Sequence, residues 1–274
     1  MKRLICFLFG LLLILCCTGC GGGEAETTVA PAVQEETTIP VTEPATVATE
    51  PTTIPTEPTT IPTEPQPVLH SGLKEDGTFD EGTWFIGDSM THILVTDYLK
   101  PNNLIGEANY TAKYGSQITA FFGDVKMQYN SYNKCAFNPE FENMEYDEVA
   151  QLLGEKATAI YIMWGTNFTW NAYADMYIEL AEYLMETCPN ATIHLQLIPW
   201  AGNNELVRYE LVNEWIREAY AHFQEIGEER VMLIDTYEGI GRNTDQGYIH
   251  LNNIGNENWY KSILDHAKMH NLAQ

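Results

Sequence analysis

Basic residues are scarce in this chain of 274 residues. Lysine and arginine together number 14, against 38 aspartates and glutamates, and the formal net charge is −24. Two of the basic residues, Lys2 and Arg3, stand at the start of the sequence, so only twelve remain beyond residue 70. Because so negative a field repels phosphate groups, the composition argues against nucleic acid or an anionic membrane surface as the partner of the folded part.

Cysteine is scarce outside the first twenty residues. Of the six cysteines, four lie in that leader, and only Cys135 and Cys188 fall in the remainder of the chain. Two cysteines in an exported protein can form one disulfide, or they can stay apart as buried thiols. The sequence leaves both readings open.

The leader has the organisation of an export signal. After its basic start, an apolar run extends from Leu4 to Leu15, and the segment ends in CCTGC. The run is too short to span a bilayer comfortably. The segment resembles a bacterial lipoprotein signal in which Cys20 becomes the lipidated first residue of the mature chain. Thr18 and Gly19 fit that motif, whereas Cys17 stands where leucine is usual. An uncleaved membrane anchor is the alternative, and in both cases the chain is exported and tethered.

The segment after the leader has no lysine and no arginine. Residues 21–70 contain eight glutamates and repeat Thr, Glu and Pro with a period near seven, as in TEPTTIPTEPTTIPTEP. Frequent proline favours extended conformers, and the glutamates repel one another. The sequence therefore predicts a disordered linker at 21–70, between a signal peptide at 1–20 and one folded domain at 71–274.

The folded part alternates short apolar runs with helical patterns. Strands are expected at 157–165, 192–199 and 230–236, and helices at 172–188, 206–227 and 256–271. Strands that alternate with helices indicate a mostly parallel sheet covered on both faces. The predicted fold is a flavodoxin-like three-layer α/β/α sandwich with about five strands. In the second helix, Val207, Leu211, Trp215 and Ala219 have the spacing of a buried face. Residues 119–150 are less regular and predict an insertion.

Glycine and polar residues follow the apolar runs directly. Trp84–Ile86 continue into Gly87-Asp88-Ser89, and the later strands continue into Gly165-Thr166-Asn167, Pro199-Trp200 and Asp235-Thr236. In an open α/β sheet, ligands bind beyond the carboxyl ends of the strands, so these residues should lie along one edge. A serine at such a turn is either a helix cap or a nucleophile. Asp88 is expected to cap the helix or brace the turn.

Four short blocks in a fixed order form a more specific pattern. They are Gly87-Asp88-Ser89, NYTAKYGSQIT around Gly115, WGTNFTW around Asn167, and GYIHLNNIGNENWY around His250. Together they resemble the SGNH (GDSL-like) hydrolase family in order and in approximate spacing. The resemblance spans nearly the whole predicted domain, from Trp84 to about Tyr260.

The resemblance implies a role for each block. Ser89 would be the nucleophile and His250 the base that takes its proton. The backbone amides of Ser89 and Gly115, with the side-chain amide of Asn167, would form an oxyanion hole. Each residue type suits its role, because glycine allows close backbone approach and asparagine donates a hydrogen bond without carrying a charge. No cofactor and no metal are expected.

The sequence departs from the family at two positions. An aspartate usually stands three residues before the histidine, but here that position is Gly247. Asp245 lies two residues further upstream and reaches His250 only if the loop bends; otherwise a backbone carbonyl orients the imidazole. Phe168 follows Asn167 where the family has aspartate, which changes the packing of that loop.

Aromatic and histidine residues outside the four blocks each have two readings. Trp164, Trp170 and Trp200 fall near the expected edge, where they wall a cleft or stack on a sugar. His266 and His270 have i, i+4 spacing on a helix, and with no third ligand visible a solvated face is favoured over a metal site.

These features predict a serine esterase that acts on acyl esters, acetyl esters foremost. The expected substrate is a small acyl ester or an acylated glycan of the cell surface or surroundings. The protein is expected to be a monomer, held by its lipid at the extracellular face of the bacterial cell membrane. Two alternatives remain. One is a non-catalytic glycan-binding domain with a decayed triad, which Gly247 supports, and the other is an O-acetyltransferase.

The lipidation assignment is tested by metabolic labelling. Cells that express the protein and are fed a radioactive fatty acid should label it, and Cys20→Ala should abolish the label, because the thiol of Cys20 is the expected acceptor. Label that persists in this variant would show that another cysteine is the anchor or that the segment is not a lipoprotein signal.

Overall fold

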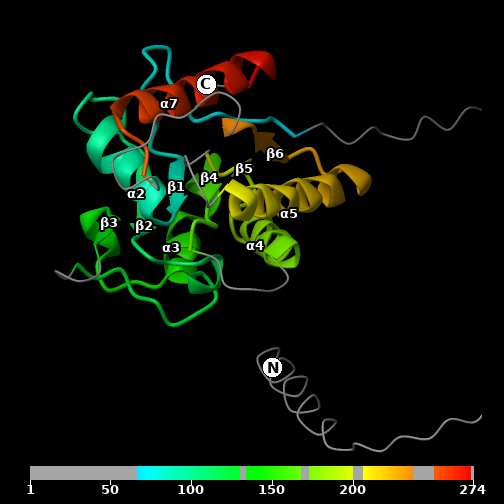
Figure 1. The fold of residues 1–274 in the computed structure, drawn as a ribbon, viewed down its shortest axis with the longest axis horizontal. Coiled ribbons are helices and arrows are strands. Elements are labelled where there is room, and N and C mark those ends of the chain that lie inside the picture. The colour runs from blue at the N-terminus through cyan, green and yellow to red at the C-terminus, as the bar shows by residue number, and fades with distance from the viewer. Residues whose placement is uncertain (1–66, 130–133, 168–172, 200–205, 237–249, 273–274) are drawn as a thin grey trace, which may run out of the picture. The chain divides into compact units, whose positions relative to one another are not determined.

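A computed structural model describes residues 67–129, 134–167, 173–199, 206–236 and 250–272, the coloured ribbon of Figure 1. The predicted signal peptide and nearly all of the predicted linker lie outside these residues, so the domain boundaries remain predictions. Among the helices that the structure describes, none is both long enough and apolar enough to cross a membrane.

A six-stranded sheet forms the centre of the fold. The strands are β1 (Thr83–Gly87), β2 (Asn109–Lys113), β3 (Cys135–Phe137), β4 (Ala159–Met163), β5 (Thr192–Gln196) and β6 (Val231–Ile234). Their order is β3-β2-β1-β4-β5-β6. All neighbours are parallel except β2 and β3, which are antiparallel. The parallel strands alone have the flavodoxin-like order, in which the chain reverses its direction of winding between β1 and β4.

Helices cover both faces of the sheet. They are α2 (Ser89–Ile93), the π-helix η2 (Leu94–Leu99), α3 (Tyr146–Leu153), α4 (Tyr173–Thr187), α5 (Leu206–Glu225) and α7 (Asn253–Met269). Short 3-10 turns occupy Ile118–Ala120, Pro139–Phe141 and Gly154–Lys156. α7 packs with η2, while α4 packs with α3 and α5 (Figure 1). The predicted three-layer α/β/α class is confirmed, with six strands where about five were expected.

Burial on both faces explains why the central strands were recognisable. Every residue of β1, β4 and β5 is buried, which is typical of parallel strands between helical layers. The predicted insertion at 119–150 was less accurate, because this segment contains β3 and α3. β3 has only three residues and closes the edge of the sheet by pairing with β2.

Two helices differ in detail from the sequence prediction. α7 begins at Asn253, three residues early, because the side chain of Asn252 caps it by accepting a hydrogen bond from the backbone nitrogen of Gly255 at 3.0 Å. In α5 the predicted buried face is only partly right. Ala219 is buried as predicted, but Leu211 and Trp215 are only half-buried, and Val212, Ile216 and Phe223 are buried in their place.

The two cysteines of the domain are buried free thiols. The sulfur of Cys135 lies 3.7 Å from that of Met127, and the Cys188 thiol donates to the backbone oxygen of Ala150 at 3.5 Å. Burial raises the pKa of each thiol to about 11. Both therefore act as small core residues and not as reactive thiolates.

A cluster of imidazoles lies between β5 and α7. The ring of His194 stacks on Tyr161 at 4.5 Å, and the ring of His266 meets it edge-on at 5.5 Å. The expectation of a solvated face for His266 was wrong, since this side chain is only 8% exposed. Neither His194 Nδ1 nor His266 Nε2 has a hydrogen-bond partner among the described residues, and no metal-ligand cluster is found there. Burial lowers the pKa of His194 to about 4 and that of His266 to about 3.

This cluster should make the fold sensitive to acid. Unfolded histidine has a pKa near 6.5, so between about pH 6.5 and 4 the unfolded chain binds protons that the folded chain does not. The free energy of unfolding should therefore fall as the pH falls, by up to about 1.4 kcal/mol per pH unit for each histidine. In urea titrations at pH 5 and pH 6, the free energy of unfolding of His266→Leu should change less between the two pH values than that of wild type. Equal slopes in the two proteins would contradict the assignment.

Candidate active site

Ser89 lies where β1 turns into α2, beyond the carboxyl end of the strand. Asp88 caps the helix, with its Oδ1 atom accepting a hydrogen bond from the backbone nitrogen of Met90 at 2.9 Å. Gly87 has no room for a side chain, because a Cβ atom there would lie 2.1 Å from the backbone oxygen of Met163. This close approach brings the turn after β1 against the end of β4.

His250 reaches the same turn from the residues just before α7. Its Nε2 atom lies 3.1 Å from the Oγ atom of Ser89, across 161 residues of sequence. α7 is fixed to the sheet by Trp259, whose indole nitrogen donates to Gln196 at 2.8 Å. The ring of Tyr114, just after β2, meets the imidazole of His250 edge-on at 5.4 Å. The distance between Ser89 and His250 is that of a nucleophile and its base.

The carboxylate of Asp88 connects the turns after β1 and β4. Its Oδ2 atom accepts two hydrogen bonds from Thr166, one from the hydroxyl at 2.6 Å and one from the backbone nitrogen at 3.1 Å. The side chain is fully buried. Burial raises the pKa of Asp88 to about 6, although the hydrogen bonds from Thr166 and Met90 act in the opposite direction by stabilising the charged form.

The side-chain amide of Asn167 is held by this connection. Its Nδ2 atom lies 3.2 Å from the hydroxyl of Thr166 and 3.3 Å from the backbone oxygen of Ser116. The hydroxyl of Thr166 gives its proton to Asp88, so it must accept from Asn167, and the backbone oxygen is always an acceptor. The network thus fixes which end of the amide faces Ser116. Both contacts are long for N–H···O hydrogen bonds and are therefore weak.

Gly115 and Ser116 form the turn after β2. Gly115 has a φ of +68°, and a Cβ atom built on it would meet nothing within 4 Å. The turn therefore has a conformation that favours glycine and faces open space. Ser116 is braced from behind by Trp164, whose indole nitrogen donates to its hydroxyl at 3.0 Å. The turns after β1, β2 and β4 are thus joined by one set of hydrogen bonds.

The structure brings together most of the residues singled out from the sequence. Ser89 and His250 are in contact, and Asn167 and the turn at Gly115 belong to the network beside them. Trp164 is fully buried, so it cannot stack on a sugar. Asp245, Gly247, Phe168, Trp170 and Trp200 lie outside the described residues, and so does Cys20. The orienting partner of His250 therefore remains a prediction.

Sequence reasoning missed three side chains of this network. Thr166 and Ser116 stand beside recognised residues, but nothing in their local pattern shows that they bond to residues 78 and 51 positions away. Tyr114 directly follows β2, a strand that the sequence did not predict. The available signal was that all three residues are sequence neighbours of Gly115 or Asn167, since residues beside a functional group commonly orient it.

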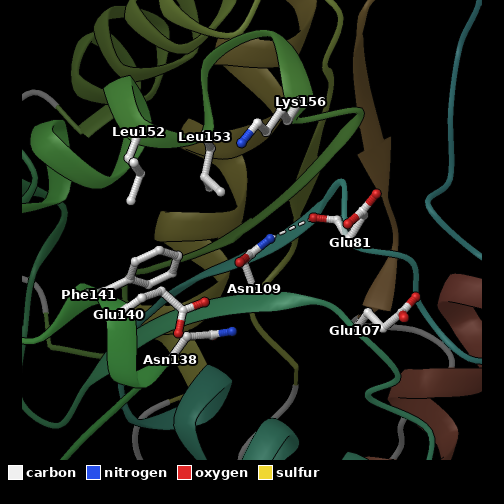
Figure 2. A pocket seen from close by; sticks show the side chains of 9 residues that line it. All are labelled: Glu81, Glu107, Asn109, Asn138, Glu140, Phe141, Leu152, Leu153 and Lys156. Carbon is white, nitrogen blue, oxygen red and sulfur yellow. Dashed lines mark hydrogen bonds between the residues drawn. The ribbon is translucent and has the colours of Figure 1, made fainter.

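A large cavity lies at the other edge of the sheet. It has a volume of about 680 Å³ and lies near the amino ends of β1, β2 and β4. Figure 2 shows Phe141, Leu152 and Leu153 along one side of it and Glu81 and Glu107 along another. Neither Ser89 nor His250 lines it. Because ligands of such sheets bind at the carboxyl edge, the contact between Ser89 and His250 marks the candidate site better than cavity volume does.

Comparison with known proteins gives likenesses in structure only. No protein-family profile and no curated protein match the sequence. The fold is similar to a GDSL-like lipase from Bacteroides thetaiotaomicron, with a TM-score of 0.45 and 11% identity over 69% of this chain and 88% of that one. It is also similar to a lipolytic G-D-S-L family protein from Veillonella parvula, with a TM-score of 0.45 and 16% identity over 67% and 96% of the two chains.

A third similar structure is an active-site mutant of a family two carbohydrate esterase from Clostridium thermocellum. Its TM-score is 0.43 and its identity 16%, over 75% of this chain and 65% of that one. The scores and identities are low throughout, so the roles of individual residues depend on the side-chain geometry of this chain.

The buried link between Asp88 and Thr166 is tested by titration. The carboxyl carbon of Asp88, followed by NMR, should titrate near pH 6, well above an exposed aspartate. Thr166→Val removes a hydroxyl that stabilises the charged carboxylate and should raise this pKa, whereas Thr166→Ser keeps the hydroxyl and should leave it unchanged. A midpoint near pH 4 in wild type, or the same midpoint in all three proteins, would contradict the assignment.

Proposed function

We propose that this protein is a serine esterase that hydrolyses acyl esters, acetyl esters foremost, with Ser89 as nucleophile and His250 as base. The single observation that supports the proposal most strongly is the 3.1 Å approach of His250 Nε2 to Ser89 Oγ at the carboxyl edge of a parallel sheet. Buried histidines and serines are common, but this pair converges from 161 residues apart beside a turn that positions hydrogen-bond donors.

The reaction begins when Ser89 Oγ attacks the carbonyl carbon of the ester. His250 Nε2 takes the proton of the hydroxyl as the new carbon–oxygen bond forms. The negative charge that develops on the carbonyl oxygen is met by the backbone amides of Ser89 and Gly115 and by the side-chain amide of Asn167. Asn167 is pre-positioned for this role by Thr166, which is itself oriented by Asp88.

The tetrahedral intermediate collapses by expelling the alcohol, which takes its proton from His250. This leaves an acyl group on Ser89 and a neutral imidazole. Water then attacks the acyl carbon while His250 removes its proton, and the carboxylic acid leaves as Ser89 recovers its hydrogen. The histidine needs an acceptor at its other nitrogen to keep the correct tautomer, and we propose Asp245 for that acceptor.

We further propose that the natural ester is on a glycan of the cell surface or its surroundings. A chain that is lipidated at Cys20 and carries a long extended linker holds its domain outside the cell, where polymers are the accessible esters. This part of the proposal depends on the assignment of the leader and linker, and the same reasoning locates the protein at the extracellular face of the membrane.

The kinetic test compares four variants on an aryl acetate and on an acetylated glycan. Ser89→Ala should lower kcat by at least about a thousandfold, because no other group can form the acyl intermediate. Asp245→Asn should lower kcat by about the same order only if its carboxylate holds His250. Ser262→Ala, whose hydroxyl bonds a backbone oxygen within α7, and the surface change Asp265→Asn are matched controls that should retain wild-type rates.

Each result has a distinct meaning. Full activity in Ser89→Ala would overturn the esterase mechanism. Normal turnover in Asp245→Asn would replace the triad with a dyad oriented by another acceptor. If wild type hydrolyses no ester and Ser89→Ala binds glycan as well as wild type does, a binding domain replaces the enzyme.

A further inference from the structure

Another cavity lies beside α2 and η2, the helical segment that begins at Ser89. Its volume is about 410 Å³, and it runs between this helical segment and the edge formed by β2 and β3. His92, one helical turn after Ser89, stands at one end, and Lys100, just after η2, stands further along. Eight residues span at most roughly 12 Å along a helix of this kind, which is about the length of two sugar rings.

Aromatic contacts connect this cavity to the candidate active site. The ring of His92 meets Tyr114 edge-on at 4.8 Å, and the opposite neighbour of Tyr114 is His250 at 5.4 Å. The ring of Tyr114 therefore contacts both His250 of the candidate site and His92 of the cavity. The exposed ring of Tyr129 lines the cavity as well, and 74% of this side chain is accessible.

Two lysines of this acidic protein lie near this region: Lys100 lines the cavity, and Lys134 lies beside Tyr114. The amino group of Lys100 donates to the hydroxyl of Tyr110 at 2.6 Å, and that of Lys134 lies 5.4 Å from the centre of the Tyr114 ring. Neither forms an ion pair with a carboxylate of the described residues, unlike Lys74, Arg217, Arg230 and Lys261. One acid, Asp97, is near, and its carboxylate accepts from the hydroxyl of Thr96 at 2.7 Å.

We propose that this cavity is a subsite for an anionic substituent, a carboxylate or a phosphate, on the sugar next to the acylated one. The proposal rests on the esterase function and adds the charge of its substrate. Lysine binds a carboxylate and a phosphate alike, because its ammonium group acts as a point charge. In a chain with a net charge of −24, an acidic glycan is repelled at a distance, so local cations are needed where it binds.

The test uses three disaccharide esters that differ only at C6 of the sugar next to the acetylated one. In each, 3-O-acetylglucose is joined to the methyl glycoside of glucose, of glucuronate or of glucose 6-phosphate. Wild type should hydrolyse at least one anionic ester with a kcat/KM about tenfold above that of the neutral ester. Lys100→Gln and Lys134→Gln should each lower this ratio about threefold, and the double variant should lower it about tenfold. Which anionic ester is preferred distinguishes a uronic acid from a sugar phosphate.

The matched controls are Lys156→Gln and Lys268→Gln, which remove the same charge far from this cavity. Their ratios should stay at the wild-type value, which separates local attraction from the net charge of the protein.

A wild type without anionic preference, or a double variant with an unchanged ratio, would overturn the subsite. If no ester is hydrolysed, the esterase proposal fails by itself, and calorimetry decides the subsite. The subsite is supported if wild type binds a hexuronate trisaccharide more tightly than a neutral hexose trisaccharide and the double variant loses this difference. Equal binding of the two trisaccharides by wild type overturns it.

Discussion

The carboxylate of Asp88 is the group on which the geometry of the site depends. It is fully buried, yet it accepts three hydrogen bonds from the turns after β1 and β4. A pKa raised by burial to about 6 means that the ionised form costs the fold about 3 kcal/mol at neutral pH. The cost disappears as the pH falls towards 4, because the group is then protonated in the folded state. A fold selected for stability alone would place an apolar side chain here, so the charge has to be explained by what it orients.

The group that Asp88 orients is the side-chain amide of Asn167, which lies two hydrogen bonds away through Thr166. Because the hydroxyl of Thr166 must give its proton to Asp88, its oxygen can only accept, and Asn167 can only donate to it. An asparagine at position 88 would present an amide N–H to another N–H in either orientation, so the network would lose its direction. The acid in the Gly-Asp-Ser turn is therefore explained by hydrogen-bond polarity, and helix capping is only half of its role.

The sequence predicted those parts of the fold that depend on local patterns. β1, β4 and β5 are buried on both faces, and glycine with a polar residue after β1 and β4 indicated the edge at which Ser89 and Asn167 lie. β2 was missed because Asn109, Thr111 and Lys113 interrupt its apolar residues, although Asn109 and Thr111 are buried through side-chain hydrogen bonds. The buried face of α5 was only partly predicted because apolar and aromatic residues occur on more than one side of it. Thr166 and Ser116 could not be identified, because their partners are brought near only by the closed sheet.

The two edges of the sheet show why volume alone does not identify a catalytic site. The amino edge has a cavity of about 680 Å³, but none of the residues that line it is a serine, a cysteine or a histidine. At the carboxyl edge, three turns each contribute groups of different chemistry: a hydroxyl after β1, a glycine turn and an aromatic ring after β2, and an amide after β4. Parallel strands place their carboxyl ends together, so residues distant in sequence converge there without any long loop. The winding of the sheet reverses between β1 and β4, and the turns that carry Ser89 and Asn167 follow these two strands. The proposed subsite at Lys100 lies against η2, which follows the turn after β1, so the topology that assembles the candidate site also places the proposed subsite beside it.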